Sequence, residues 1–215
     1  SGLRPDLDLE PAWSGYETGI RLALADKPVA APGERFIYSD INYILLGEVV
    51  RRVSGRPLNE YAAEVVFKPL GMRWTTFQPP AGWRPRIAPT EGILRGVVHD
   101  ATARNMGGVS GHAGVFSTAD GLARFAEMMI GLGAFRGVRL FSPMTIRRFT
   151  APQSPPDQPV LRGLGWDVDS PYSGPRGDLL PLGSYGHTGF TGTSLWIDPS
   201  TETAVILLAS SLHPK

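Results

Sequence analysis

The sequence predicts an α+β fold, in which helices flank an antiparallel sheet formed by the last third of the chain. Apolar residues recur at helical spacing up to about residue 150. After residue 160, short runs of β-branched and aromatic residues alternate with turn residues, which is typical of strands. The chain has 215 residues, 42% of them hydrophobic, which is enough for one sizeable core. We therefore expect a single domain over residues 1–215, with a mostly helical part at about 10–150 and a β-meander at about 160–210.

The helices are expected at residues 16–25, 41–53 and 59–67, with two further helices beginning after Ser117 and at Ser142. The strongest of them is 41–53, where four apolar residues follow one another at i+4 spacing: Ile41, Leu45, Val49 and Val53. Asp40 stands at the expected N-cap of this helix, and Gly55 at its end.

The strands are expected at residues 163–168, 184–190, 193–197 and 203–210. Asp198 opens the segment 198–202 (DPSTE), which has the composition of a hairpin turn between the last two strands. Consecutive short strands with tight turns predict an antiparallel meander.

The composition excludes several classes of protein. The 21 basic and 20 acidic residues leave a net charge of +1, so no electrostatic attraction to nucleic acid is expected. With no cysteine, disulfides, thiolate nucleophiles and zinc–thiolate sites are excluded. The longest strongly apolar run, residues 204–209, is too short to span a membrane. The cellular compartment stays open.

Tyr38, Ser39 and Asp40 form the first candidate site, directly before the strongest helix. A tyrosine or aspartate there could act as a general base at a helix N-terminus. An aromatic staple with an N-cap is the structural alternative.

Residues 186–190 (GHTGF), on an expected strand, form the second candidate site. Glycines on both sides of His187 and Thr188 would let a ligand approach the backbone closely, although a glycine-rich bulge has the same pattern.

Metal ligation is a weaker possibility. His99, His112 and His187 could bind a metal together with Asp100, but no two histidines have helical i, i+4 spacing and no His-Glu-x-x-His motif occurs. We expect neither a metal nor another cofactor.

No serine nucleophile is recognisable in the chain. Ser110, in GVSGH, lacks the final glycine of a nucleophile elbow. A Ser-x-x-Lys motif would place hydroxyl and amine one helical turn apart, but no serine is followed by lysine at that spacing. Ser211 and Lys215 are four residues apart. We expect a serine nucleophile, if the protein uses one, to lie outside this chain.

Taken together, the motifs resemble those of the serine β-lactamase and penicillin-binding-protein superfamily, in its class C β-lactamase-like branch of D-Ala-D-Ala carboxypeptidases and esterases. That family carries Ser-x-x-Lys, then Tyr-x-Asn, then Lys/His-Thr/Ser-Gly. The second motif corresponds to Tyr38-Ser39-Asp40 and the third to residues 187–189 (HTG). Residues 69–72 (PLGM) and 111–129 (GHAGVFSTADGLARFAEMM) are similar to landmarks between them. The opening SGL resembles the end of an element that follows the Ser-x-x-Lys helix.

The resemblance covers nearly the whole chain and implies a β-lactamase/transpeptidase-like fold with a helical subdomain, incomplete at both ends. It implies a hydrolase that acts through an acyl-enzyme on an ester, peptide or β-lactam carbonyl of a small molecule or peptide. The partner it implies is the missing N-terminal segment carrying Ser-x-x-Lys, and this chain alone is expected to be inactive. Relatives are often extracytoplasmic.

The resemblance also implies roles for individual residues. Tyr38 would share the proton transfer with the absent lysine. His187 would lie beside Tyr38 and steer a substrate carboxylate or support that transfer. Thr188 would hydrogen-bond the substrate, Gly189 would let it approach, and the N–H of Phe190 would form half of the oxyanion hole.

Asp40 departs from the asparagine that is commonest in the family. A carboxylate only accepts hydrogen bonds, whereas an amide also donates. Asp40 is therefore expected to hold the lysine charged or to cap the helix, and to favour esters or peptides over β-lactams. Two alternatives remain open: a non-catalytic binding or scaffold module of the same fold, and a His/Asp metallohydrolase.

Overall fold

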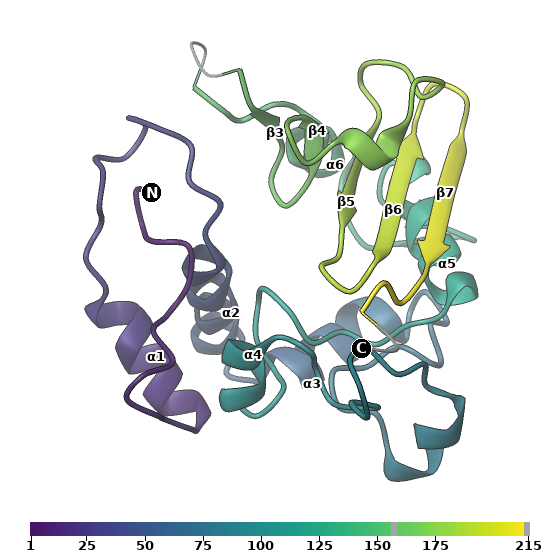
Figure 1. Ribbon diagram of the computed structural model, residues 1–215. Coiled ribbons are helices and arrows are strands. Elements are labelled where there is room, and N and C mark those ends of the chain that lie inside the picture. The colour runs from purple at the N-terminus through teal and green to yellow at the C-terminus, as the bar shows by residue number, and fades with distance from the viewer. Residues whose placement is uncertain (156–158, 213–215) are drawn as a thin grey trace. The chain divides into compact units, whose positions relative to one another are not determined.

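The computed structural model describes residues 1–155 and 159–212, which form two compact units (Figure 1). Unit 1 contains residues 1–64 and 75–116, and unit 2 contains residues 65–74 and 117–212. Mixed helices and antiparallel sheets confirm the predicted α+β class. The expectation of one domain over the whole chain stays a prediction. Among the described residues, no helix has the length and apolar character needed to cross a membrane.

Unit 1 is built from helices and loops. Its elements are α1 (Tyr16–Ala25), α2 (Asp40–Ser54), α3 (Leu58–Ala62), the 3-10 helix η2 (Ala81–Arg86) and α4 (Ala101–Asn105). α3 runs on into a π-helical turn, η1 (Ala63–Phe67), so the helix expected at 59–67 is present in two forms. α1 packs on α2, and the small core that they share consists of apolar residues: Leu7, Ile20, Ala23, Ile41, Ile44 and Met106.

Helix α2 begins one residue earlier than expected. Ser39 occupies the N-cap position, so the expectation that Asp40 is the N-cap is wrong. Ser39 does not cap the helix through its side chain, because its hydroxyl donates to the carbonyl oxygen of Arg4 at 2.6 Å. The helix ends as predicted at Gly55, which adopts a left-handed conformation with φ 70° and donates its N–H to Arg51 O.

A buried carboxylate links α1 to α2. Glu48 is 2% exposed and accepts hydrogen bonds from Arg51 Nε at 2.7 Å, Arg52 Nε at 2.6 Å and the Tyr16 hydroxyl at 2.9 Å. The bonds from Arg51 and its neighbours lower the pKa of Glu48 to about 2. Burial and the contact with Glu48 raise the pKa of Tyr16 to about 12.

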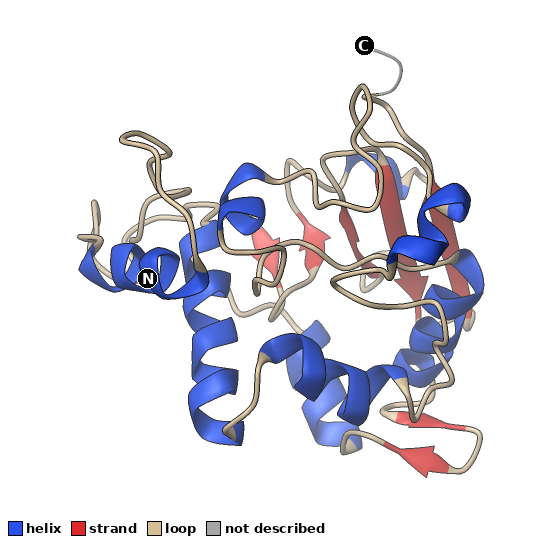
Figure 2. Cartoon of the chain, turned by 90° about the horizontal axis from the view of Figure 1, so that it is seen from below, coloured by secondary structure: helices blue, strands red, loops and turns tan. Residues whose placement is uncertain are grey.

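Unit 2 contains the sheet. Its helices are α5 (Ala119–Ile130), α6 (Pro143–Thr150) and the 3-10 helix η3 (Gly174–Arg176). Its strands are β1 (Ala134–Phe135), β2 (Val138–Arg139), β3 (Leu161–Arg162), β4 (Asp167–Asp169), β5 (Tyr185–Thr188), β6 (Thr193–Asp198) and β7 (Thr203–Leu208). β3 to β7 form one antiparallel sheet in sequence order, which is the predicted meander. β1 and β2 form a separate hairpin (Figure 2).

The helix start predicted at Ser142 is confirmed, and the start predicted at Ser117 lies one residue later, with Thr118 as the N-cap. The Thr118 hydroxyl accepts the N–H of Gly121 at 3.1 Å, and the Ser142 hydroxyl accepts that of Thr145 at 3.1 Å. α5 packs on β6 and β7 (Figure 1), where Ala126, Met128 and Met129 are buried in the core.

One predicted strand is only partly present. Residues 167–168 of the strand expected at 163–168 lie in β4, whereas residues 163–166 form the turn between β3 and β4, closed by the N–H of Gly163 donating to Trp166 O at 2.8 Å. Gly165 takes φ 85° within it, which is unfavourable in a strand. β5 is also shorter than expected, because a turn with the N–H of Gly192 bonded to Gly189 O follows Thr188.

Candidate functional site

The second-motif residues, Tyr38, Ser39 and Asp40, enter α2 beside the N-terminal segment of unit 1. Besides the bond from Ser39 to Arg4, the N–H of Asp40 donates to Pro5 O at 2.7 Å. Two hydrogen bonds to neighbouring carbonyl oxygens of the N-terminal segment therefore hold this turn in place. Tyr38 is 38% exposed, so part of its side chain is open to solvent, whereas Asp40 is half-buried.

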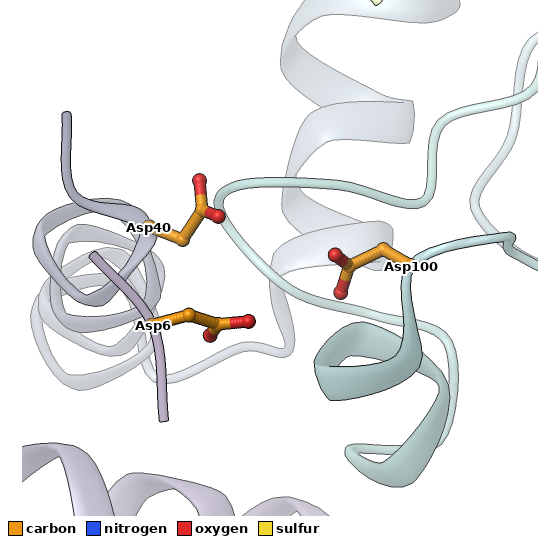
Figure 3. A group of neighbouring side chains, drawn as sticks. All are labelled: Asp6, Asp40 and Asp100. Atoms are coloured by element: carbon orange, nitrogen blue, oxygen red, sulfur yellow. The ribbon is translucent and has the colours of Figure 1, made fainter. Parts of the chain in front are cut away.

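Asp40 points toward two other carboxylates (Figure 3). Asp6 comes from the N-terminal segment and Asp100 from the N-cap of α4, and carboxylate oxygens of the three lie within 4.8 Å of one another. Burial raises the pKa of Asp40; the charge of His112 opposes that rise, and the charges of Asp6 and Asp100 add to it. The structure thus brings Asp40 into an acidic cluster that the sequence analysis did not foresee.

Helix α4 explains how Asp100 and Asp6 are held. Asp100 Oδ1 accepts the N–H of Ala103 at 2.6 Å as the N-cap, and Asp6 Oδ2 accepts the Thr102 hydroxyl at 2.9 Å. The sequence analysis missed α4, because its five residues are too short for a helical pattern to be recognised.

The imidazole of His112 lies against the cluster. Its side chain is 2% exposed, with Nε2 2.9 Å from Asp100 Oδ1 and Nδ1 2.9 Å from the Ser110 hydroxyl. Burial disfavours the charged imidazole, but the hydrogen bond and charge of Asp100 outweigh it and raise the pKa of His112 above its ordinary value. His112 also lowers the pKa of Asp100 despite the burial of that carboxylate.

Of the four residues considered for a metal, His112 contacts Asp100, whereas His99 Nε2 contacts Glu91 Oε2 at 2.9 Å. His187 belongs to unit 2, so a site shared by all four stays an untested alternative.

The third-motif residues lie on β5 and in the turn after it. β5 pairs with β6 along residues 185–188 but with β4 only through Gly186 and Asp167, so His187 and Thr188 lie beyond the β4 pairing. A Cβ at Gly186 would overlap the buried indole of Trp196, so the packing of Trp196 explains this glycine.

The remaining motif residues form the turn to β6. Thr188 is paired with Ser194, and the N–H of Gly189 donates to Thr193 O at 2.7 Å. Phe190 follows in this turn with its side chain 82% exposed.

The hydrogen bonds of His187 select one tautomer. Arg162 Nη2 lies 3.0 Å from its Nε2, and the Thr188 carbonyl oxygen lies 2.7 Å from its Nδ1. A guanidinium only donates and a carbonyl only accepts, so the ring is neutral, with its proton on Nδ1. Burial lowers the pKa of His187, and the charge of Arg162 acts in the same direction.

The positive charge beside the third motif therefore belongs to Arg162. Its Nη1 donates to Asp167 Oδ1 at 2.7 Å, and Asp167 is fully buried and also accepts the Ser170 hydroxyl at 2.6 Å. The sequence analysis missed Arg162 and Asp167, because nothing in their local sequence shows that β3 and β4 bring them to β5.

Tyr38 and Asp40 belong to unit 1, and residues 187–190 belong to unit 2. The expectation that Tyr38 and His187 lie side by side stays a prediction.

A family model described as "Beta-lactamase" matches residues 1–215. Among curated proteins, one named "Putative D-alanyl-D-alanine carboxypeptidase" from Escherichia coli O157:H7 is 38% identical over 204 residues, which cover 85% of this chain and 46% of that protein. Its namesake from Salmonella schwarzengrund is also 38% identical, with the same coverage. The chain thus spans about half the length of the curated relatives it matches.

Solved structures show the same fold. A β-lactamase from Mycobacterium bovis is 25% identical with a TM-score of 0.62, over 86% of this chain and 60% of that one. A penicillin-binding protein from Bacillus halodurans has a TM-score of 0.73 at 18% identity, over 98% of this chain and 65% of that one. The latter likeness concerns the fold alone.

Proposed function

The chain belongs to the beta-lactamase family, and on that basis we propose that it is part of a serine hydrolase of the class C-like branch. The reaction is acyl transfer from an ester, peptide or β-lactam carbonyl, and the nucleophilic serine and its lysine lie on a segment outside this chain. The chain supplies the second and third motifs.

The observation that carries this proposal is the placement of those motifs on suitable elements. Tyr38, Ser39 and Asp40 immediately precede the long helix α2, and His187, Thr188 and Gly189 lie at the end of an interior strand. Both positions are held by partly buried hydrogen bonds, which favour the preorganisation that a site needs. The 38% identity to proteins named as carboxypeptidases supports the same reaction class.

Tyr38 is the proton-transfer residue in this mechanism. The serine oxygen attacks the carbonyl and loses its proton to the lysine–Tyr38 pair, the leaving group takes a proton as its bond breaks, and water later hydrolyses the acyl ester. Cationic neighbours are needed to give a tyrosine a pKa near the working pH. The partial exposure of Tyr38 is compatible with this role.

His187 has a positioning role next to the substrate rather than a charged one. Since its ring is neutral, the cation beside it is Arg162, whose charge is already paired with the buried carboxylate of Asp167. Thr188 hydrogen-bonds the substrate, Gly189 leaves room for it, and the N–H of Phe190 is one oxyanion donor. Such a donor contributes roughly 3 kcal/mol to the transition state.

Covalent labelling of the complete protein tests this function. We expect a fluorophosphonate to label one serine in a Ser-x-x-Lys motif encoded upstream of Ser1, and its Ser→Ala variant to be unlabelled. We expect the 215-residue chain by itself to remain unlabelled. A complete protein that binds β-lactams or peptides without any covalent labelling would instead be a binding module, and a labelled serine within residues 1–215 would place the nucleophile elsewhere.

A further inference from the structure

Three carboxylates that converge in a half-buried site favour a compensating positive charge. Asp6, Asp40 and Asp100 come from three different elements, and their oxygens lie within 4.8 Å of one another (Figure 3). Like charges at this distance disfavour ionisation of each carboxylate, and a nearby cation offsets that effect. The protonation state of Asp40, in the second motif, depends on how this is resolved.

The hydrogen bonds of His112 indicate which group carries the positive charge. Its Nε2 lies 2.9 Å from Asp100 Oδ1, and a carboxylate only accepts, so the ring donates its Nε2 proton to the cluster. Its Nδ1 lies 2.9 Å from the Ser110 hydroxyl, which can accept from a protonated Nδ1 and itself donate to the sulfur of Met106 at 3.6 Å. The surroundings therefore accommodate the imidazolium, and the three carboxylates favour it over the neutral ring.

We propose that His112 is a buried imidazolium at neutral pH that serves as the counter-ion of the Asp6–Asp40–Asp100 cluster and thereby holds Asp40 ionised at the start of α2. His112 is then a positioning residue for the second motif. Its charge state is independent of the proposed function, whereas its consequence for catalysis rests on that function.

Gly111, the residue before His112, packs closely against helix α2. A Cβ at Gly111 would collide with the carbonyl oxygen of Tyr43, and the amide nitrogen of Gly47 would lie 3.1 Å from it. The loop that carries His112 is therefore packed against the second turn of α2, close to Asp40. This packing restricts the position of the loop, and the buried side chain of His112 moves less than a surface side chain would.

Three acidic groups among the described residues favour a charged His112. The N-terminal segment contributes Asp6, α2 contributes Asp40 and the N-cap of α4 contributes Asp100. His99, whose charge also acts on Asp100, is paired with Glu91. This balance agrees with the direction in which the pKa of His112 is displaced.

Nitrogen-15 NMR of the histidines in the complete protein, recorded from pH 5 to 9, tests the charge state directly. We expect both ring nitrogens of His112 to carry protons at pH 7, with a midpoint above the ordinary 6.5, whereas His187 shows a proton on Nδ1 only. A neutral His112 at pH 7 would overturn the proposal. So would stoichiometric binding of Ca²⁺ or Zn²⁺ that perturbs Asp6, Asp40 and Asp100, because a metal would then supply the charge.

Coupling between His112 and Asp40 is tested by substitution. Asp40→Asn should lower the midpoint of His112 by about one pH unit, since one of its facing charges is removed. His99→Gln is the matched control and should leave the midpoint within the error of the titration. An unchanged midpoint in the Asp40→Asn variant would overturn the counter-ion role even if His112 proved to be charged.

A catalytic readout distinguishes positioning from simple folding. In the complete protein, His112→Gln should lower kcat about tenfold in the Asp40 background and much less in the Asp40→Asn background, because there is less charge left to balance. Equal losses in both backgrounds would show that His112 acts only through stability. If the protein had no hydrolase activity at all, the proposed function would fail while the NMR result would still decide the charge state.

Discussion

Removing the hydroxyl of Tyr38 distinguishes a role in proton transfer from a role in packing. In the complete protein, Tyr38→Phe should lower kcat by about 10²–10⁴ and change KM much less, because only the hydroxyl takes part in proton transfer. The ring is retained, so the thermal midpoint should hardly change. Steady-state kinetics on one ester substrate measure this. An unchanged kcat would leave Tyr38 as an aromatic residue that only packs.

Asp40 is the residue at which specificity should be decided. Asp40→Asn introduces an N–H donor, so β-lactam turnover in the complete protein should rise by about one to two decades relative to ester turnover. The ratio of the two kcat/KM values is the measurement. Because Ser39, not Asp40, occupies the N-cap, a pure capping role is already a poor explanation for Asp40. A constant ratio with both activities intact would retire the specificity argument.

At the scale of elements, the buried carboxylate of Glu48 between α1 and α2 makes the stability of the fold depend on pH in the acidic range. The pKa of Glu48 is about 2 in the folded chain, below the 4.5 of the free group. Its stabilising effect is therefore complete above about pH 4.5 and is lost as the pH falls toward 2. Solvent around the more exposed Arg51 and Arg52 screens the contacts, so the effect is at most about 3 kcal/mol.

Glu48→Gln should remove most of this pH dependence, in addition to destabilising the protein near neutral pH. Urea unfolding at a series of pH values between 5 and 2 measures it. Glu17→Gln is the matched control, since Glu17 is an exposed partner of the same Arg51 at 3.6 Å. A Glu48→Gln variant with the slope of the unmodified protein would show that the arginines are not what holds Glu48 ionised.

At the scale of the whole molecule, each unit brings one motif to a preorganised state. Unit 1 holds the second motif by bonds to the N-terminal segment, and unit 2 holds the third motif through Arg162 and the sheet. His112 faces carboxylates and is charged in our proposal, whereas His187, within the third motif, faces a guanidinium and is neutral. The chain spans about half the length of its curated relatives. Within it, the second and third motifs lie in different electrostatic environments.

Much of the fold was predictable because it depends on near neighbours in the chain. Helix α1, the end of α2 at Gly55 and the starts at Thr118 and Ser142 follow from periodicity and capping residues within one or two turns. Only the last two residues of the strand predicted at 163–168 are strand, because Gly163 and Gly165 lie in a turn that occupies the first four. The motifs at Tyr38 and His187 were recognisable because each is contiguous in sequence.

By itself, the sequence determined the α+β class, the meander and the residues of the two motifs. Only the tertiary structure decided their electrostatics. Asp6, Asp40 and Asp100 are separated by dozens of residues, and so are Arg162 and His187, yet a charge state depends on what lies within a few ångströms in space. Periodicity and capping residues determine secondary structure through neighbours in the sequence. The protonation state of a side chain depends on every element that the fold packs around it. For that reason a charged His112 and a neutral His187 could be distinguished only after the chain was folded.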